Sequence, residues 1–220
     1  VVLMDKAAGG AFVFLKGANH INVSDRSHVD GEVVKEGNES FTYPIGNGGF
    51  YRMAGISAPA IQADEYTGEY VLQNTDPLYP HSSRTGVIDR IDDKEHWIIN
   101  QKTASDKNVL VTLSWDDRTT PNYLLDQNID RLHVLRWDKN QSLWVDEGGI
   151  VDRASKTVTT LTEVEGYGIF TLGTVKPNVI QPGDVVIYNG VTPDGDGMND
   201  YFIIDNIWLY PQNTVRIYNR

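Results

Sequence analysis

The sequence predicts an all-β fold, with a main domain built as an Ig-like β-sandwich. Its apolar residues alternate with polar ones or gather in short runs, and almost none of them follow the helical period. These runs are rich in Val, Ile, Thr, Tyr and Trp, as half-buried strands are. The runs predicted as strands are Ala11–Leu15, Trp97–Asn100, Val109–Trp115, Leu132–Trp137, Val158–Leu161, Gly168–Leu172, Val185–Tyr188 and Val215–Tyr218.

Turn-forming residues separate the runs, at Asn47-Gly48-Gly49, Asp116-Asp117, Asp138-Lys139-Asn140 and Gly148-Gly149. The first of these is a glycine-rich loop, which would hold phosphate only if it followed a strand and opened a helix. A strand-like run, Tyr51–Ile56, follows it instead, so a β-turn is the expected structure. One short helix is predicted, within Pro121–Arg131.

The chain divides into four parts by pattern. Residues 1–38 form a β-rich lead-in, interpreted either as the end of a stacked or solenoid-like stalk or as the first strands of the sandwich. Residues 39–174 have the densest strand pattern and make the main domain. Residues 175–182 contain two prolines and suit a semi-extended linker, after which strands restart in residues 183–220. The chain opens in mid-pattern, as expected of a piece of a longer protein.

Composition argues against several classes of function. The 220-residue chain has a net charge of −11, which disfavours nucleic acid and electrostatic anchoring to a membrane. No apolar run is long enough for a transmembrane span, so direct membrane insertion is not expected. Cysteine is absent, which excludes disulfides and thiolate metal sites.

No catalytic constellation is indicated by the sequence. There is no Gly-x-Ser-x-Gly elbow and no His-Glu-x-x-His. The five histidines, whose spacing is not that of metal ligands, are His20, His28, His81, His96 and His133. We therefore expect a protein that is not an enzyme.

Tryptophans recur in three short stretches, Ser114–Asp116, Arg136–Asp138 and Leu143–Val145, as Trp115, Trp137 and Trp144. Exposed, they would stack on sugar rings and make a carbohydrate-binding face. Buried, they would fill the sandwich core, because each removes a large apolar area from water. Core packing is the favoured interpretation, and a carbohydrate-binding or carbohydrate-active protein is the alternative.

An acidic stretch near the C-terminus alternates oxygen-bearing side chains with glycines. Calcium takes several oxygen ligands from one tight loop, and the candidate ligands are Asp194, Asp196, Asn199 and Asp200. The pattern departs from an EF-hand loop, because Met198 and Asn199 stand where a polar ligand and glycine are usual. A hairpin turn, in which Gly and Asn accept positive φ, is the favoured interpretation. A calcium-dependent adhesive module stays the alternative.

The run Gly183–Phe202 closely resembles the start of the gliding-motility-associated C-terminal domain, the type B sorting domain of Bacteroidetes surface proteins. The family's pattern is Asn-Gly-Val-(Ser/Thr)-Pro-Asn-Gly-Asp-Gly-x-Asn-Asp, and only Asp194 departs from it. The segment Tyr210–Arg220 is similar to the family's next motif. The positions that carry the resemblance are Asn189, Gly190, Pro193, Gly195, Asp196, Gly197, Asn199, Asp200, Pro211, Asn213, Asn219 and Arg220.

This resemblance implies that residues 183–220 are the first half of a second Ig-like sandwich, a sorting domain for the type IX secretion system. The implied partners are the type IX translocon and an outer-membrane protein of the PorP/SprF type. The implied location is extracellular or at the cell surface, associated with the outer membrane, and the implied role is adhesin-like or related to gliding. Asp25–Asn38 is similar to the region found before such domains in large cell-surface proteins.

Overall fold

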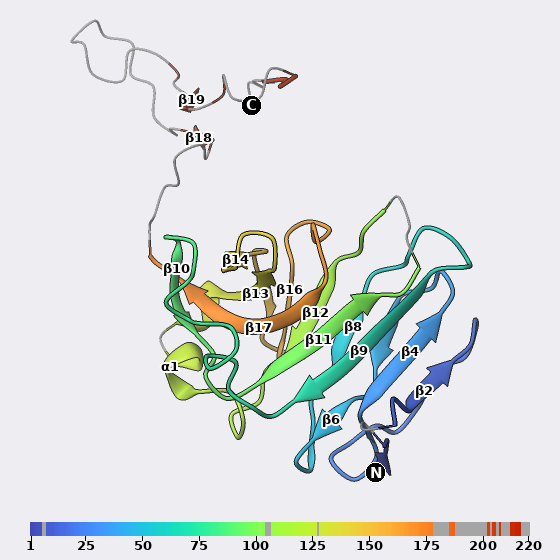
Figure 1. The fold of residues 1–220 in the computed structure, drawn as a ribbon. Coiled ribbons are helices and arrows are strands. Elements are labelled where there is room, and N and C mark those ends of the chain that lie inside the picture. Colours follow the sequence, from blue (N-terminus) through green and yellow to red (C-terminus); the bar gives the residue numbers. More distant parts are fainter. Residues whose placement is uncertain are drawn as a thin grey trace, which may run out of the picture. The chain divides into compact units, whose positions relative to one another are not determined.

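A computed structural model describes residues 1–5, 8–103, 107–126, 128–177, 185–187, 202, 204–205, 207 and 212–216. The chain separates into two compact units, Val1–Pro177 and Asn178–Arg220. The first unit is an all-β sandwich, which confirms the predicted fold class, and its Ig-like character stays a prediction (Figure 1). In the second unit, β18 (Val186–Ile187) pairs antiparallel with β19 (Ile204–Asp205).

An eight-stranded sheet forms one layer of the sandwich (Figure 1). Strand β17 has neighbours on both sides, and β10 also pairs with its C-terminal part. In spatial order the main path is β14 (Leu143–Asp146), β13 (Leu132–Asp138), β17 (Gly168–Val175), β11 (His96–Gln101), β9 (Glu65–Val71), β4 (Glu32–Glu36) and β2 (Ala11–Phe14), with β10 (Ile88–Ile91) beside β17.

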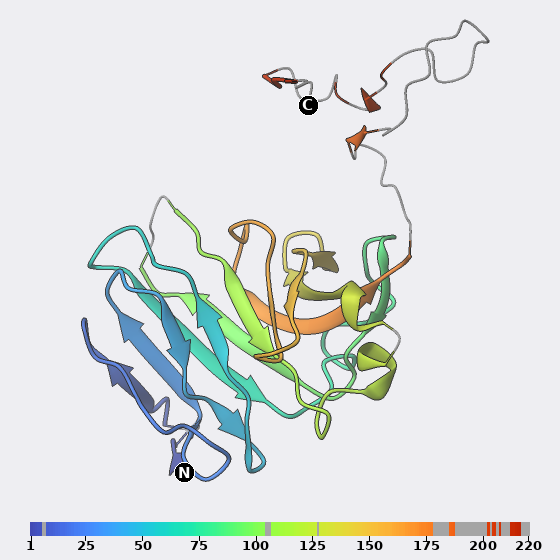
Figure 2. The same cartoon turned by 180° about the vertical axis from the view of Figure 1, so that it is seen from behind.

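A five-stranded sheet forms the other layer of the sandwich. Figure 2 shows the molecule from behind, so that this sheet lies toward the viewer. Its strands in order are β15 (Ile150–Asp152), β16 (Thr157–Thr159), β12 (Val111–Ser114), β8 (Ala54–Ile56) and β5 (Phe41–Tyr43). The smaller elements are β1 (Val2–Leu3), β3 (Val29–Asp30), β6 (Gly46–Asn47), β7 (Phe50–Tyr51), α1 (Asn122–Leu125) and a 3₁₀ turn at Ile129–Arg131.

One contiguous hydrophobic core fills the space between the two sheets. It is built by the alternation of each strand, since every second side chain of a strand points to the same face. Tyr66 and Tyr70 of β9 are fully buried, and Trp97 of β11 packs against Tyr70 at 5.3 Å between ring centroids. Gly68 lies between the two tyrosines, where an added Cβ would lie 2.8 Å from the ring of Tyr43. Glycine is therefore required there by packing.

A buried polar network crosses this core. The guanidinium of Arg52 donates to Glu95 through Nη2–Oε1 at 2.7 Å and Nε–Oε2 at 3.2 Å, and both side chains are shielded from solvent. Tyr70 and Thr120 donate their hydroxyls to the same carboxylate, at 2.6 and 2.5 Å. The guanidinium also lies 5.3 Å from the centroid of the Trp97 ring. The network thus joins β9, β11 and the chain before β8 in the interior.

Asp92 is a second buried carboxylate close to this network. Its Oδ1 accepts the backbone N–H groups of Lys94 and Glu95, at 2.8 and 3.2 Å. Burial raises the pKa of Asp92 well above its usual range, and the negative charge of Glu95 raises it further. Both carboxylates are enclosed by the fold, because the side chains of Asp92 and Glu95 are fully buried.

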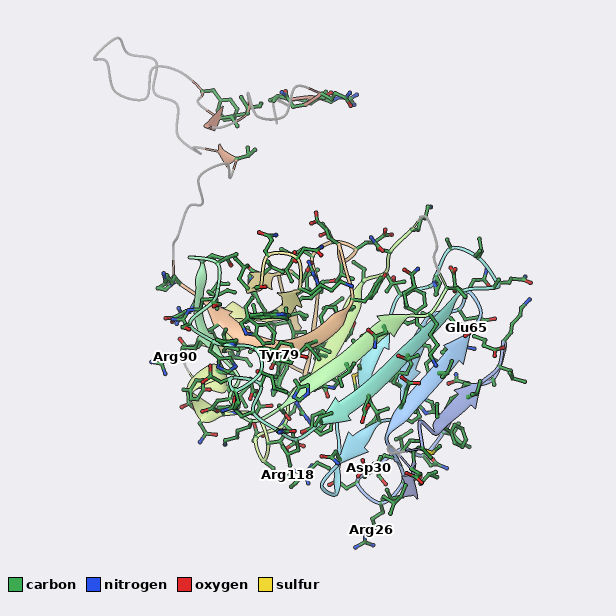
Figure 3. All side chains as sticks on the ribbon, viewed as in Figure 1. Arg26, Asp30, Glu65, Tyr79, Arg90 and Arg118 are labelled. Atoms are coloured by element: carbon green, nitrogen blue, oxygen red, sulfur yellow. The ribbon has the colours of Figure 1, made fainter. Side chains whose placement is uncertain are left out.

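Exposed ion pairs hold loops at one end of the sandwich, where Arg118 is labelled in Figure 3. Arg118 binds Asp25 and Asp116, each at 2.6 Å. Its hydrogen bond lowers the pKa of Asp116 to about 2. Such pairs fix loop geometry more than they add stability, because water screens them.

The N-terminal strands pair in parallel, unlike the rest of the sandwich. Strand β1 runs parallel to β3, with Val2 opposite Val29, and β2 runs parallel to β4, with Val13 opposite Val34. Strand β4 continues antiparallel to β9, so residues of the predicted lead-in belong to the same sheet as the main domain. The predicted boundaries at residues 38, 174 and 182 stay predictions.

All the predicted strand runs but one contain a strand of the structure. Residues 215 and 216 of the predicted run Val215–Tyr218 are not in a strand, and the rest of that run lies outside the described residues. The glycine-rich loop is a β-turn between β6 and β7, as predicted, with positive φ at Gly48 and Gly49. The predicted helix is shorter than Pro121–Arg131, because α1 ends at Leu125.

Candidate functional site

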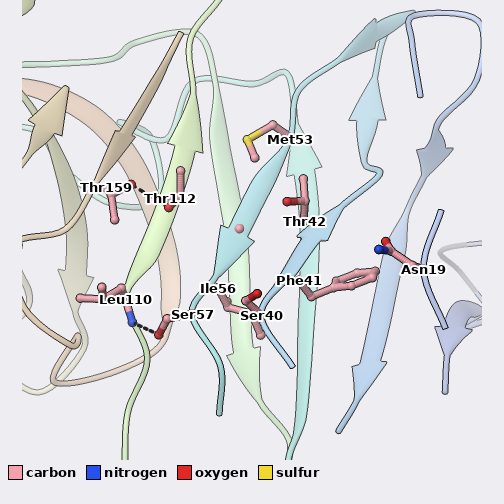
Figure 4. A pocket seen from close by; sticks show the side chains of 11 residues that line it. Asn19, Ser40, Phe41, Thr42, Met53, Ile56, Ser57, Leu110, Thr112 and Thr159 are labelled. Atoms are coloured by element: carbon pink, nitrogen blue, oxygen red, sulfur yellow. Dashed lines mark hydrogen bonds between the residues drawn. The ribbon is translucent and has the colours of Figure 1, made fainter. Parts of the chain in front are cut away.

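A trough about 430 Å³ in volume lies on the outer face of the five-stranded sheet. Figure 4 shows its lining side chains, which come mainly from β5, β8, β12 and β16. Ser40, Met53, Ser57 and Leu110 directly adjoin these strands in the chain, and Asn19 comes from the segment between β2 and β3. The eleven lining residues are Asn19, Ser40, Phe41, Thr42, Met53, Gly55, Ile56, Ser57, Leu110, Thr112 and Thr159.

The register of the strands places small side chains in one row across this face. Thr42 of β5 lies opposite Gly55 of β8, and Gly55 lies opposite Thr112 of β12. Thr112 in turn lies opposite Thr159 of β16. The neighbouring residues in each strand are Tyr43, Ala54, Leu113 and Val158, all of which are buried in the core. The row therefore lies on the face opposite the core. Gly55 within it is itself buried between its neighbours, and it lines the trough.

Hydroxyl groups dominate the polar lining. The hydroxyls of Thr112 and Thr159 bond each other at 2.8 Å, and Ser57 accepts the backbone N–H of Leu110 at 2.9 Å. A hydroxyl has one donor and two acceptor sites, so each of these groups keeps hydrogen-bonding capacity toward a ligand. Thr42 is exposed on the opposite wall. The trough can therefore both donate and accept hydrogen bonds.

The trough carries no formal charge on any of its lining residues. Two other cavities, of about 390 and 470 Å³, differ in this respect, because both contain Arg136, Asp138 and Glu165. Arg136 is mostly buried there and donates to Glu147 at 2.5 Å. Burial raises the pKa of Glu147, while the bond to Arg136 opposes that rise. In those cavities Arg136 is already engaged by Glu147 and lies 3.9 Å from the carboxylate of Asp138.

The tryptophans do not form a stacking platform. Trp115 is buried in the core between the sheets, as the favoured interpretation predicted, whereas Trp144 is buried in a second hydrophobic cluster with Ile88, Ile91 and Leu135. Trp137 is half-buried and packs against Tyr79 and Trp144, at 5.4 and 5.7 Å between ring centroids. The three tryptophan rings considered as a stacking surface for sugars thus lie in the interior of the protein or at the edge of that interior.

The candidate calcium ligands Asp194, Asp196, Asn199 and Asp200 lie outside the described residues. In the part of the chain that the structure describes, no three His, Asp or Glu residues form a group able to hold a metal ion. The same part contains no arrangement that points to catalytic activity. It also contains no helix with the length and apolar character needed to cross a membrane.

The predicted sorting residues are described at one position only. Asn213 is exposed, and its amide donates to the carbonyl of Ile207 at 3.4 Å. The others lie outside the described residues, namely Asn189, Gly190, Pro193, Gly195, Asp196, Gly197, Asn199, Asp200, Pro211, Asn219 and Arg220.

The trough was not predicted from the sequence. Its polar residues are one asparagine, two serines and three threonines, which are ordinary residue types, and they come from segments that are distant along the chain. One signal was present, the isolated Gly55 inside a strand-like run, since such a glycine marks a bulge or a close approach.

Comparison with known proteins identifies one segment of the chain. Residues 185–220 match the family model of the CHU_C type IX secretion signal domain. The predicted sorting domain at the C-terminus is thereby confirmed, and such a signal implies contact with the type IX secretion machinery and export from the cell. No curated protein and no solved structure matches the chain.

Proposed function

We propose that this chain, with a type IX secretion signal at residues 185–220, is part of a non-catalytic protein that is displayed at the cell surface or secreted. The match of that segment to the signal domain carries the proposal. The compact unit Val1–Pro177 has a core of its own and is the cargo that the signal exports. In this proposal residues 1–38 supply the first strands of the sandwich, residues 39–174 form its main part, and residues 175–182 link it to the sorting domain.

The finer role is adhesin-like or related to gliding, with the sorting domain docked on an outer-membrane protein of the PorP/SprF type. Its support is the resemblance of Gly183–Phe202 to the start of type B sorting domains. A docked protein stays on the cell after export, whereas a protein without a docking partner is released to the medium. The two fates are distinguishable in the same cells.

The export route is tested by inactivating the type IX translocon in a host that carries it. We expect the protein to accumulate in the periplasm, because the signal then has no machinery to recognise it. The measurement is the amount of protein in periplasmic, surface and medium fractions, with a protein exported by another route as control. Unchanged export without the translocon would contradict the proposal. Removal of the PorP/SprF-type partner alone is expected to move the protein from the surface to the medium.

Calcium binding by the acidic turn is a separate proposal, supported by the four oxygen-bearing side chains at Asp194, Asp196, Asn199 and Asp200. We expect calcium to release heat in a calorimetric titration of the chain and to raise its melting temperature. The double variant Asp194→Ala/Asp196→Ala is expected to remove both effects, because half of the carboxylate and amide ligands are lost. A titration without heat and without a shift in melting temperature would leave the turn a purely structural hairpin.

A further inference from the structure

We propose that the trough on the outer face of the five-stranded sheet binds a neutral saccharide. The inference rests on Gly55, on the uncharged lining and on the mixture of hydroxyl and apolar groups around that glycine. It concerns the displayed unit and does not depend on the export route.

Gly55 is the first observation, because neither the backbone nor the packing requires a glycine there. Its φ is not in the positive region, and its pairing is regular with both neighbouring strands, so there is no bulge. A Cβ at this position would lie 3.4 Å from Cβ of Thr112 and 3.8 Å from Cε of Met53, which are ordinary contacts. Glycine in a strand interior weakens the strand, and one common reason for it is the close approach of a ligand.

The contrast with Gly68 strengthens this argument. Gly68 also lies inside a strand, but there an added Cβ would lie 2.8 Å from the ring of Tyr43 in the core. The core therefore explains Gly68 and leaves Gly55 unexplained. Gly55 is buried between Thr112, Phe41 and Met53 and still lines the trough, so the missing side chain leaves the trough deeper at this point.

Charge selects the class of ligand. The chain has a net charge of −11, so an anionic ligand meets an unfavourable field over most of the surface. A cationic ligand would favour carboxylates, and the trough has none. An uncharged ligand avoids both penalties, since it brings no charge that must lose its hydration shell on binding.

The lining matches the two kinds of surface that a sugar ring presents. A saccharide offers hydroxyls around its rim, and Thr42, Thr112 and Thr159 offer hydroxyls in one row. It also offers apolar C–H faces, and Met53 and Leu110 supply apolar contact. The volume of about 430 Å³ falls within the range of about 300–1,000 Å³ that small-molecule sites occupy. Because the walls are paired strands, the shape is formed before the ligand arrives.

The test is a binding screen of the purified 220-residue chain against neutral oligosaccharides: malto-, cello-, xylo-, manno- and chitohexaose. Oligogalacturonate and chondroitin sulfate serve as anionic probes, and an extended uncharged peptide as a probe of another class. We expect at least one neutral hexasaccharide to bind and the anionic probes not to bind. Titration calorimetry then gives the affinity for the hexasaccharide that binds.

Three variants locate the binding. Gly55→Val fills the trough with a residue that strands favour, and it is expected to weaken binding by about tenfold or more. Thr112→Val keeps the shape but removes one hydroxyl, with an expected loss of about three- to tenfold. Thr157→Val, on the same strand as Thr159 but outside the trough, is the matched control and should leave the affinity unchanged. Thermal melts establish that each variant is folded.

Several results would overturn the proposal. One is the absence of binding to every neutral hexasaccharide, and another is binding to the anionic probes or to the peptide alone. A third is an affinity that Gly55→Val and Thr112→Val leave at the wild-type value, which would place the saccharide elsewhere. If Gly55→Val does not fold, the affinity of Thr112→Val is compared with that of Thr157→Val. That comparison decides whether the saccharide binds in the trough or elsewhere.

Discussion

Deletion of Gly183–Arg220 is expected to abolish surface display and to leave the shortened protein in the periplasm. The deletion removes the segment that matches the type IX secretion signal, while the unit Val1–Pro177 keeps its own hydrophobic core. Nothing then marks the folded cargo for the translocon. The measurement is protease accessibility on intact cells, together with the amount of protein in the periplasmic and medium fractions.

Two controls separate a sorting defect from a folding defect. The purified shortened chain is expected to melt cooperatively, as a unit with an intact core does. The full chain with Gly55→Val is expected to be displayed at the wild-type level, because that change lies in the other compact unit. Normal display of the shortened chain would mean that the export signal lies elsewhere in the sequence.

Glu95→Ala is expected to lower the free energy of unfolding by about 3–5 kcal/mol, the usual cost of removing one partner of a buried ion pair. The change leaves the guanidinium of Arg52 buried without its carboxylate. It also leaves the hydroxyls of Tyr70 and Thr120 without their acceptor, which adds unsatisfied polar groups to the core. Urea denaturation followed by tryptophan fluorescence measures the effect, since Trp97 lies beside the network.

An exposed ion pair of the same protein provides the matched control. Arg153 binds Asp130 at 2.6 Å, but both side chains are mostly exposed to solvent. Arg153→Ala is therefore expected to change the free energy of unfolding by less than about 1 kcal/mol. An equal effect of Glu95→Ala and Arg153→Ala would contradict the view that the buried pair is a main support of the core.

Local signals in the sequence were sufficient to predict those strands whose residues are typical of strands. The run that contains Val111–Ser114 is rich in β-branched residues and was predicted as a strand. Strand β9 (Glu65–Val71) was missed, although it lies in the middle of the large sheet. Its two glutamates and its glycine weaken the strand pattern, and only the tertiary structure explains them. Gly68 makes room for Tyr43, and the glutamates point away from the core.

The sorting segment could be recognised in the sequence because its motif is continuous along the chain. The trough and the buried network could not, because both depend on contacts between distant residues. Arg52 and Glu95 are separated by 43 residues, and neither lies in a motif. Thr42 and Thr159 lie in one row across the trough only because of the register of four strands. Both the trough and the buried network depend on contacts between distant residues, which a single sequence does not reveal.

Strand β17 has a mechanical consequence for a protein held at a surface by its C-terminal segment. A pulling force on that segment acts on the sandwich at Val175, the last residue of β17. This strand bonds to β13 on one side and to β11 and β10 on the other. A force along the strand must therefore shear both ladders at once, whereas an edge strand would have only one ladder to resist the same force. A C-terminal tether would thus be joined to the sandwich at a strand that is hydrogen-bonded on both sides.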